Sequence, residues 1–270
     1  MPVVSSHDLE FGSHTVTKSY RSWGRGEPQR EWSALGLLQR NAPGLAPQPL
    51  SADLHGEPPS VVMTRLPGES LADVLVTTDQ TEAMADALHR LHTAVPAADL
   101  ANQPLRNWHP AEAVANLRAW IQERHELGDD RQTAAAFDSA SRWLESAEPD
   151  QLVAADVPPV FAMGDGNLSN FIWCDGEVRL VDFEDSGRSD RAFELADIVE
   201  HISLWVDDPV NTDLLMDALA LEAKERTRFV GCRRLWSTFW LLMLLPSGRA
   251  HARNPVGTID RQVQRVLRLL

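Results

Sequence analysis

Residues 161–185 read Phe161-Ala-Met-Gly-Asp-Gly-Asn-Leu-Ser-Asn-Phe-Ile-Trp-Cys-Asp-Gly-Glu-Val-Arg-Leu-Val-Asp-Phe-Glu-Asp185, and the rest of the chain is organised around them. Two short apolar segments flank the turn pair Asp175-Gly176, a pattern that predicts a β-hairpin. Such a hairpin would hold Asn170 at one end and Asp182 at the other, close to Asp165. We therefore expect three oxygen-bearing side chains to converge at the mouth of the hairpin.

These three side chains have the spacing that phosphoryl transfer requires. An aspartate, here Asp165, can orient an attacking hydroxyl and accept its proton, while Asn170 and Asp182 can hold magnesium against the phosphates of ATP. The Asp-x4-Asn spacing is that of a kinase catalytic loop, and Asp182-Phe183 stands where a kinase has its metal-binding Asp-Phe-Gly. An isolated Asp-x4-Asn can also arise by chance in a turn, so the prediction depends on the hairpin and on Asp182 together.

The stretch resembles the aminoglycoside phosphotransferase and choline kinase-like family, whose usual sequence is His-Gly-Asp-x4-Asn, a hairpin, and then Ile/Val-Asp-Phe/Trp. The next block, Ser186-Gly-Arg-Ser-Asp190 with Phe193-Glu-Leu-Ala196, also resembles that family. The resemblance implies a two-lobe, protein kinase-like α+β fold. Its small β-rich N-terminal lobe with the hinge, which is shortened here, would span residues 1–66. The large and mainly helical C-terminal lobe with the central hairpin would span residues 67–270.

Two features depart from the family's pattern. Met163 stands where the family usually has a histidine that supports the loop, and only seventeen residues precede Lys18, where the family has more chain to cover the phosphates. The glycine-rich Gly-x-Gly-x-x-Gly and P-loop sequences are also missing. A catalytically weak, kinase-shaped binding module is therefore the alternative to an enzyme. The joint presence of Asp165, Asn170 and Asp182 favours the enzyme.

The first 64 residues predict a small β-rich lobe with one helix. Val3-Val4 and residues 14–20 have the character of strands, and alternation in the second puts Val16, Lys18 and Tyr20 on one face. A strand lysine among apolar neighbours is where a kinase keeps the lysine that contacts the phosphates. An ordinary edge-strand lysine would give the same local pattern.

Recurring apolar residues predict a helix over residues 29–39, with Glu31 in its first turn. The resemblance implies that Glu31 pairs with Lys18, although an acidic residue is favoured at any helix N-terminus. The apolar strand at residues 60–64 is followed by the break Arg65-Leu-Pro-Gly68, which resembles the family's hinge. Met63 and Arg65 are therefore predicted to contact the nucleotide through their backbone groups.

From residue 69 onward the sequence predicts helices, with the hairpin as the exception. Periodic apolar positions indicate helices over residues 81–92, 111–126, 131–145, 192–206, 213–221, 225–245 and 257–270. His89 and His92 lie three residues apart, but no further side chain has the spacing of a metal ligand, so we expect them to pack rather than to bind metal.

Acidic residues gather in the segment that leaves Asp182. We predict that Glu184, Asp185, Glu194 and Asp197 bind the acceptor, because carboxylates along a cleft raise the local concentration of an amine-bearing substrate. Glu194 and Asp197 share one face of the predicted helix. The alternative is that some of these residues cap the helix or pair with nearby arginines.

The composition limits the class of partner. A net charge of −14 argues against nucleic acid, whose phosphates need a basic surface. Two cysteines and an N-terminus without a signal-peptide pattern suggest a cytoplasmic protein. The apolar run at residues 235–245 is too short to span a membrane. We therefore expect a small-molecule substrate and a nucleotide as partners, without nucleic acid or membrane.

The sequence as a whole predicts an O-phosphotransferase that uses ATP or GTP and Mg²⁺. Its acceptor would be a hydroxyl group of a small, cationic molecule. An aminoglycoside-type antibiotic is the first candidate, which would make the protein a resistance enzyme. A small metabolite, such as an amino alcohol or a sugar, is the second.

Overall fold

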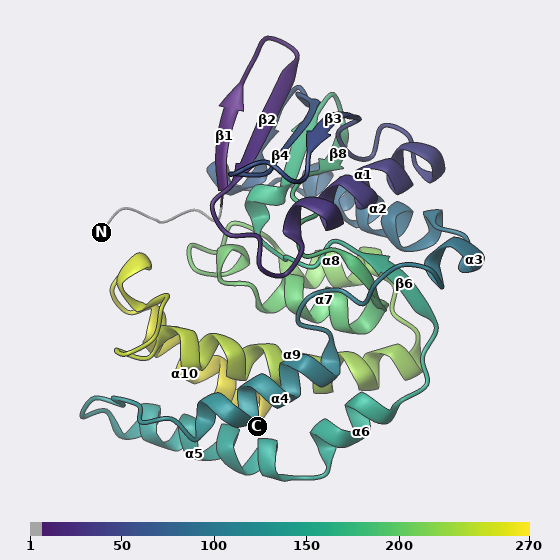
Figure 1. Cartoon of the computed structure of the whole chain (residues 1–270). Coiled ribbons are helices and arrows are strands. Elements are labelled where there is room, and N and C mark those ends of the chain that lie inside the picture. Colours follow the sequence, from purple (N-terminus) through teal and green to yellow (C-terminus); the bar gives the residue numbers. More distant parts are fainter. Residues whose placement is uncertain (1–6) are drawn as a thin grey trace.

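The computed structural model describes residues 7–270, apart from the side chain of Asp73. The chain forms two lobes, with a twisted sheet in the upper part of Figure 1 and a group of helices below it. The strand expected at Val3-Val4 lies outside the described residues. The α+β architecture predicted from the sequence is confirmed.

The upper lobe contains an antiparallel sheet in the order β1-β2-β4-β3. Its strands are β1 (His7–Phe11), β2 (Thr15–Tyr20), β3 (Pro49–Asp53) and β4 (Ser60–Thr64). Gly12 N donates to Thr15 O in the turn between β1 and β2. Lys18 on β2 lies opposite Leu9 on one side and Val61 on the other. The lysine therefore belongs to a central strand, which removes the edge-strand alternative.

Helix α1 (Glu27–Asn41) packs against β3 and β4. Pro28 suits its first turn, where the backbone N–H groups have no partner within the helix. Ala34, Leu35 and Leu38 are buried on the face that meets the core. The helix predicted over residues 29–39 is confirmed and extends two residues further at each end.

The lower lobe is mainly helical. Its helices are α2 (Thr78–Ala94), α3 (Ala97–Leu100), α4 (Pro110–Ile121), α5 (Arg131–Glu145), α6 (Glu148–Ala154), α7 (Arg191–Glu200), α8 (Thr212–Leu219), α9 (Ala223–Leu244) and α10 (Thr258–Leu269). The described residues also contain four 3₁₀ segments: η1 (Leu71–Asp73), η2 (Leu168–Asn170), η3 (Ile202–Leu204) and η4 (His251–Arg253). Helix α9 contacts α4, α6, α7 and α10, which makes it the centre of the lobe.

Two predicted helices end more than one helical turn earlier than expected. The helix predicted over residues 192–206 stops at Glu200, because His201 adopts an extended backbone with ψ of 132° and η3 follows. The helix predicted over residues 111–126 stops at Ile121. The first of these breaks has a consequence for the site, because it turns the His201 side chain toward the catalytic loop.

The lower lobe also contains more strands than the hairpin alone. Strands β7 (Phe171–Cys174) and β8 (Glu177–Leu180) form that hairpin, and β5 (Glu69–Ser70) pairs with β7. A separate pair joins β6 (Pro159–Ala162) to β9 (Gly187–Asp190). The expectation that the hairpin would be the exception was therefore wrong. The β6–β9 pair frames residues 163–186 and brings the start and end of this segment together.

One hydrophobic core runs through both lobes. It includes Tyr20 and Leu35 from the upper lobe and Phe171, Leu180 and Val266 from the lower lobe. Leu180 N donates to Leu45 O at 2.8 Å, which fixes the hairpin to the upper lobe. Within residues 7–270, none of the helices combines the length and the apolar character needed to cross a membrane.

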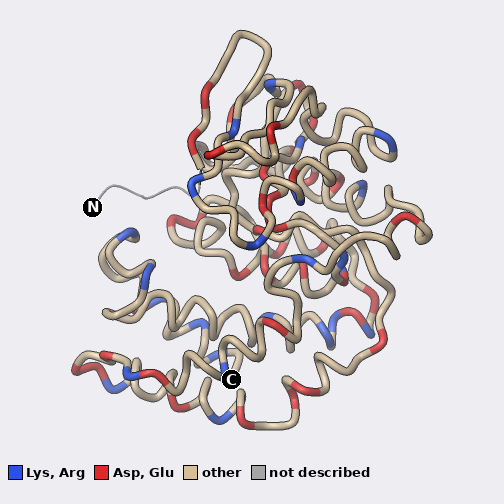
Figure 2. The backbone as a smooth tube through the Cα atoms, in the orientation of Figure 1, with Lys and Arg blue, Asp and Glu red and all other residues tan. Residues whose placement is uncertain are grey.

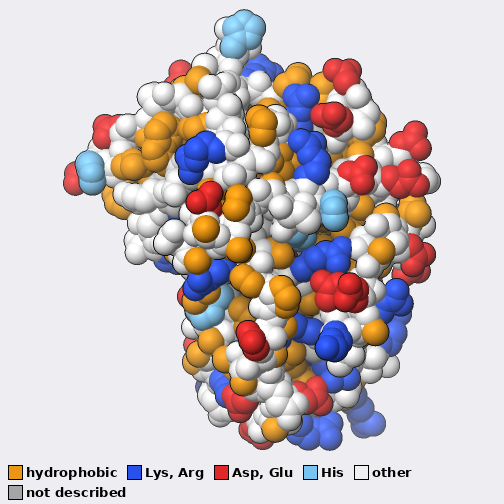
Figure 3. Space-filling model, turned by 90° about the vertical axis from the view of Figure 1, so that its right-hand side faces the viewer, with side chains coloured by type: hydrophobic (Ala, Val, Ile, Leu, Met, Phe, Trp, Pro, Cys, Tyr) orange, Lys and Arg blue, Asp and Glu red, His pale blue; other side chains and the backbone are white. Residues whose placement is uncertain are grey.

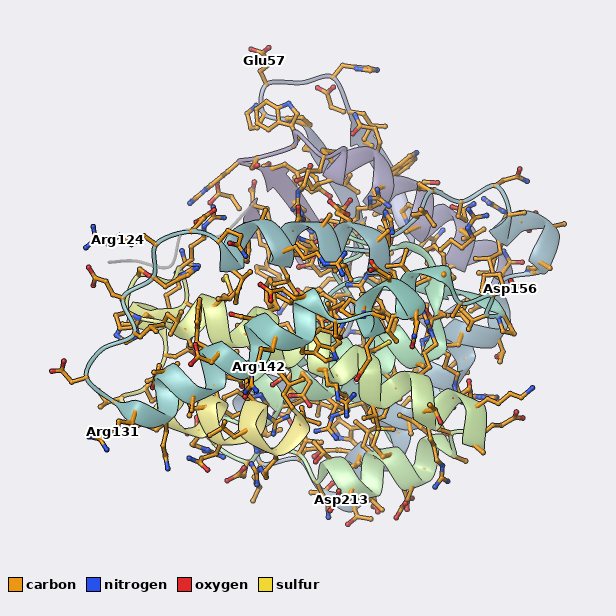
Figure 4. The ribbon with its side chains drawn as sticks, turned by 90° about the horizontal axis from the view of Figure 1, so that it is seen from below. Glu57, Arg124, Arg131, Arg142, Asp156 and Asp213 are labelled. Atoms are coloured by element: carbon orange, nitrogen blue, oxygen red, sulfur yellow. The ribbon has the colours of Figure 1, made fainter. Side chains whose placement is uncertain are left out.

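Acidic and basic residues are distributed over both lobes (Figure 2). The face drawn in Figure 3 mixes acidic, basic and hydrophobic side chains. Arg124, Arg131 and Asp213 point outward from the periphery of the helical lobe (Figure 4). Several charged groups of the site, among them Lys18, Glu31 and Arg106, differ from these because they are buried.

Candidate active site

The β7–β8 hairpin brings Asn170 and Asp182 together. Asp175 and Gly176 form its turn with φ of 52° and 86°, the left-handed pair that a type I′ turn requires. At the other end, Val181 N donates to Asn170 O at 3.0 Å. Asp182 follows with φ of 67°, a strained conformation for a non-glycine residue that often occurs at functional sites. Both side chains therefore stand at one mouth of the hairpin.

Asp165 lies beside Asn170 in the loop between β6 and β7. Its Oδ1 accepts a hydrogen bond from Asn167 N at 3.1 Å, and its Oδ2 accepts one from Asn170 Nδ2 at 3.2 Å. The side chain keeps 36% of its surface exposed. Burial of the group by the surrounding protein, together with the charges of Asp182 and Asp185, raises the pKa of Asp165 to about 7. Such a carboxylate can accept a proton from a hydroxyl near neutral pH.

The backbone around Asp165 is tightly enclosed. Gly164 has φ of 88°, and a Cβ added there would lie 2.3 Å from Asp185 O. A Cβ at Gly166 would lie 2.6 Å from Ile198 Cα on helix α7. One glycine is therefore needed on each side of Asp165, because the loop has to fit between α7 and the segment after Asp182.

Lys18 reaches from the upper lobe into a group of carboxylates. Its Nζ lies 2.5 Å from Glu31 Oε2, 2.6 Å from Asp182 Oδ1 and 2.9 Å from Glu184 Oε2. The lysine is only 2% exposed. Burial alone would lower the pKa of Lys18, but Glu31, Asp182 and Glu184 raise it well above the usual value, so the ammonium stays charged. The predicted contact between Lys18 and Glu31 is present.

Glu31 also connects the upper lobe with Asp182. Its Oε2 accepts a hydrogen bond from Tyr20 Oη at 2.9 Å, and its Oε1 accepts one from Phe183 N at 3.3 Å. Because Phe183 directly follows Asp182, Glu31 positions both Lys18 and the backbone next to the predicted metal ligand. Glu31 is therefore more than an acidic residue favoured by a helix N-terminus.

The oxygen atoms at the hairpin mouth could hold a magnesium ion. Glu31, Asp182 and Glu184 have oxygens within 4.8 Å of one another. Asp182 Oδ1 contacts Lys18, which leaves Oδ2 as a ligand. Because Asn170 Nδ2 donates to Asp165, its Oδ1 is kept as an acceptor. Carboxylate and amide oxygens are hard ligands that suit Mg²⁺, so the residues present fit the predicted ion.

Glu194 and Asp197 do not line a cleft, contrary to the prediction from the sequence. They are 1% and 4% exposed, and both bind the buried Arg106. Arg106 Nη1 donates to Glu194 Oε2 and Nη2 donates to Asp197 Oδ2, each at 2.6 Å. The expectation that these two carboxylates collect a cationic acceptor is therefore wrong, because they neutralise an internal arginine.

The same three residues support the catalytic loop. Arg106 Nη2 also donates to Gly164 O at 2.7 Å. Glu194 Oε1 accepts hydrogen bonds from Met163 N at 2.8 Å and from Gly164 N at 3.2 Å. The backbone at Met163, where the family usually has a histidine, is thus held by helix α7. Nothing in the local sequence around Arg106 predicted this contact, since its partners lie 88 and 91 residues further along the chain.

Glu184 and Asp185 have different environments. Glu184 is buried beside Lys18, and its Oε2 lies 3.4 Å from His7 Nδ1. Glu184 therefore lies next to Lys18, and its contact with an acceptor stays a prediction. Asp185 Oδ1 accepts a hydrogen bond from Asn107 Nδ2 at 2.5 Å and lies 3.4 Å from Arg25 Nη1. Its contact with an acceptor stays a prediction.

The hinge residues Met63 and Arg65 already make contacts within the sheet. Met63 is buried opposite Val16, and Arg65 N donates to His14 O at 2.9 Å. The Arg65 guanidinium lies over the Phe11 ring, 5.5 Å from its centroid. The Arg65 N–H is thus already engaged. A contact of Met63 or Arg65 with the nucleotide stays a prediction, and for Arg65 it would have to use the carbonyl group.

Two lobes that meet around Lys18, Asp165, Asn170 and Asp182 define a kinase-like phosphotransferase. Three solved structures share this fold along almost the whole chain. A choline/ethanolamine kinase family protein from Mesorhizobium loti has a TM-score of 0.69 and 18% identity, over 98% of this chain and 85% of that chain. The choline kinase LicA from Streptococcus pneumoniae has a TM-score of 0.64 and 17% identity, over 100% and 91%. A spectinomycin phosphotransferase solved with ADP and spectinomycin has a TM-score of 0.63 and 12% identity, over 99% and 90%.

At these identities the likeness to solved structures shows a shared fold. The search of curated proteins gave no significant match. The sequence pattern of the phosphotransferase enzyme family matches residues 16–230, so the chain belongs to that family. The protein is a small-molecule kinase whose acceptor is an alcohol group, as the sequence predicted.

Proposed function

We propose that the protein transfers the γ-phosphoryl group of ATP or GTP, with Mg²⁺, to a hydroxyl group of a small cationic molecule. The observation that supports this most directly is the convergence of Lys18 from the upper lobe with Asp165, Asn170 and Asp182 from the lower lobe. Phosphoryl transfer depends on positioning and on charge stabilisation, and these four side chains supply both.

On the nucleotide side, Lys18 contacts the phosphates and Glu31 holds it in place. Asn170 and Asp182 hold the magnesium ion, which neutralises charge on the phosphates when bound. Glu184 adds a third carboxylate next to Lys18. With three carboxylates and one ammonium group, this part of the site is negatively charged, which suits a divalent cation.

On the acceptor side, Asp165 orients the hydroxyl and accepts its proton. The hydroxyl oxygen then bonds to the γ-phosphorus, and the bond from phosphorus to the nucleoside diphosphate breaks. The hydrogen bonds from Asn167 and Asn170 hold the Asp165 carboxylate in one orientation. The raised pKa of Asp165 suits this transfer near neutral pH.

Buried and half-buried aromatic rings, rather than a row of carboxylates, pack behind His201. Trp240 packs edge-on against His201, which is 3.7 Å from Asp165. Phe239 connects Trp240 to Trp108 at ring-centroid distances of 5.3 and 5.2 Å. Because Glu194 and Asp197 are engaged by Arg106, fewer carboxylates near Asp165 are free to bind amino groups, which favours a compact amino alcohol over an aminoglycoside-type acceptor with several amino groups.

An aminoglycoside-type antibiotic is the second candidate acceptor. Asp165, Asp182 and Asp185 keep the cleft negatively charged, which also suits a polycation. Spectinomycin and kanamycin are bound in solved structures that share the fold. Resistance to such an antibiotic would follow only if this second candidate is correct.

A panel of acceptors tests the proposal. Choline, 2-aminoethanol, kanamycin and spectinomycin are incubated with ATP or GTP and Mg²⁺, with glucose as the neutral comparison and the Asp165→Asn variant as the inactive control. Acceptor-dependent release of nucleoside diphosphate, with the phosphorylated product identified by mass spectrometry, is expected to be most efficient for an amino alcohol. A higher kcat/KM for glucose than for every amine would refute the cationic acceptor.

A further inference from the structure

His201 lies next to Asp165, although the sequence gave no reason to place it there. It follows the last residue of α7, and its Nε2 is 3.7 Å from Asp165 Oδ1. The ring is 12% exposed and packs edge-on against Trp240, with ring centroids 4.9 Å apart and planes at 88°. His201 therefore borders the space in front of the catalytic carboxylate.

Ser203 determines which ring nitrogen carries the proton. Ser203 N donates a hydrogen bond to His201 Nδ1 at 3.2 Å, and Ser203 Oγ lies 2.8 Å from the same nitrogen. A nitrogen that accepts from a backbone N–H cannot itself carry a proton in that direction, so a neutral ring must carry its proton on Nε2. Burial lowers the pKa of His201 to about 3, which keeps the ring neutral.

The serine also connects this ring to the catalytic loop. Leu168 N donates to Ser203 Oγ at 2.8 Å, which leaves the Oγ proton for His201 Nδ1. Leu168 lies between Asp165 and Asn170 in the sequence. The loop, Ser203 and His201 thus form a closed arrangement that returns to Asp165 and fixes the direction of the Nε2–H group.

The distance between His201 and Asp165 leaves room for one oxygen atom. At 3.7 Å, Nε2 and Asp165 Oδ1 are further apart than the usual hydrogen-bond range. Among residues 7–270, the structure gives Nε2 no closer acceptor. An oxygen placed about 2.8 Å from both atoms would satisfy both, since such contacts are ideal hydrogen bonds. A hydroxyl suits this place, because it can donate to a carboxylate and accept from an N–H at the same time.

We propose that His201 binds the acceptor's hydroxyl oxygen through its Nε2–H, beside Asp165. The assignment rests on the proposed transfer to an alcohol. In the reaction, the hydroxyl proton moves to Asp165, the oxygen bonds to the γ-phosphorus, and the bond to the leaving nucleoside diphosphate breaks. His201 keeps its proton throughout. Its role is to hold the oxygen so that a free lone pair points at phosphorus, a matter of orientation.

Two substitutions at His201 separate the hydrogen bond from the packing. His201→Phe keeps a ring against Trp240 but has no N–H group, whereas His201→Gln keeps an amide donor near the position of Nε2. His92 provides the matched control. It is a second buried histidine, on α2, and neither of its ring nitrogens has a hydrogen-bond partner among the described residues.

For the best acceptor of the panel, His201→Phe is expected to lower kcat/KM by about 100-fold, the effect of losing the orientation of a reacting group. The KM for the nucleotide should stay unchanged. His201→Gln should recover part of the loss, and His92→Phe should match the parent protein. If the parent protein transfers phosphate and His201→Phe does so with the same kcat/KM, the proposed role of His201 is wrong while the proposed function still stands. No transfer by the parent to any alcohol would count against the proposed function, and so the two failures are distinguishable.

The tautomer can be measured without any acceptor. In protein with ¹⁵N-labelled histidine, and with His201→Gln used for assignment, NMR should show His201 with a protonated Nε2 and an unprotonated Nδ1 at neutral pH. A proton on Nδ1, or a doubly protonated ring at neutral pH, would overturn the proposal. A histidine that only packed against Trp240 would not require its proton to be on one particular ring nitrogen.

Discussion

Asp165 is the side chain whose removal should separate chemistry from nucleotide binding. Asp165→Asn keeps the shape of the group but removes the proton acceptor. We expect kcat to fall by about 10²- to 10⁴-fold, the usual contribution of a positioned acid–base group. Calorimetry should show almost unchanged nucleotide affinity. Asp175→Asn, at the exposed tip of the hairpin, is the matched control and should keep full turnover, because asparagine tolerates the left-handed conformation found there.

The same carboxylate should also reduce stability above neutral pH. The pKa of Asp165 is about 7 in the folded protein and 3.8 in the absence of neighbours. The unfolded chain therefore loses this proton at lower pH than the folded chain, and the penalty grows between pH 4 and pH 7. Asp165→Asn should be more stable than the parent in urea denaturation at pH 8 and equally stable near pH 4. A gain of the same size at both values would contradict the raised pKa.

Lys18 and Glu31 should act as a unit. Lys18→Met leaves Glu31, Asp182 and Glu184 without their shared cation, so we expect a large loss of nucleotide affinity. Glu31→Gln should cost less, since Asp182 and Glu184 still hold the ammonium group. In a double-mutant cycle the pair should show a coupling of about 0.5–3 kcal/mol. Strictly additive effects on nucleotide binding would mean that Glu31 does not position the lysine.

At the scale of elements, Arg106 joins helix α7 to the catalytic loop. Arg106→Met would leave the buried carboxylates of Glu194 and Asp197 without their shared cation, and breaking a buried charge pair typically costs about 3–5 kcal/mol. Urea denaturation should show a loss of this size. Arg118→Met removes an arginine that pairs with exposed Asp150 and donates to Leu144 O, so it serves as the control and should cost much less than Arg106→Met. Equal losses in the two variants would show that the buried arginine does not hold the loop.

Elements whose determinants are local were predictable from the sequence. The hairpin follows from Asp175-Gly176 between apolar segments, and α1 follows from its apolar spacing. Strands β6 and β9 were missed because no turn pair joins them as Asp175-Gly176 joins β7 and β8, and because the sequence of β9, Gly187-Arg-Ser-Asp190, has no alternating apolar pattern. Such strands form because their partner is placed by the surrounding fold, which a local pattern does not contain.

The site residues likewise divide into those that the local sequence predicts and those that depend on distant segments. Asp165, Asn170 and Asp182 lie on one continuous stretch, so their spacing was informative. The partners of Glu194 and Asp197 were hidden, because an acidic helix face looks the same whether it meets solvent or a buried arginine from a distant segment. His201 was hidden for a related reason. Its approach to Asp165 depends on the end of α7 at Glu200, and the apolar periodicity continued beyond that residue.

At the scale of the whole molecule, the nucleotide site is shared between the lobes. Lys18 and Glu31 belong to the upper lobe, whereas Asn170 and Asp182 belong to the lower lobe. A ligand that contacts all four can bind only when the lobes are folded and docked. Because such a ligand binds the native state and not the unfolded chain, it should stabilise both lobes together.

Thermal denaturation with nucleotide and Mg²⁺ tests this arrangement. At a free nucleotide concentration of 100 times Kd, the expected stabilisation is about 2.7 kcal/mol, and the two lobes should unfold in one transition with a raised Tm. Chelation of the magnesium should remove most of the shift. Asp182→Asn should show only the small shift in Tm that the parent shows without magnesium, whether or not magnesium is present, because one metal ligand has lost its charge. Asp150→Asn on the surface is the control and should behave like the parent. A magnesium-dependent shift of full size in Asp182→Asn would move the metal site away from the hairpin mouth.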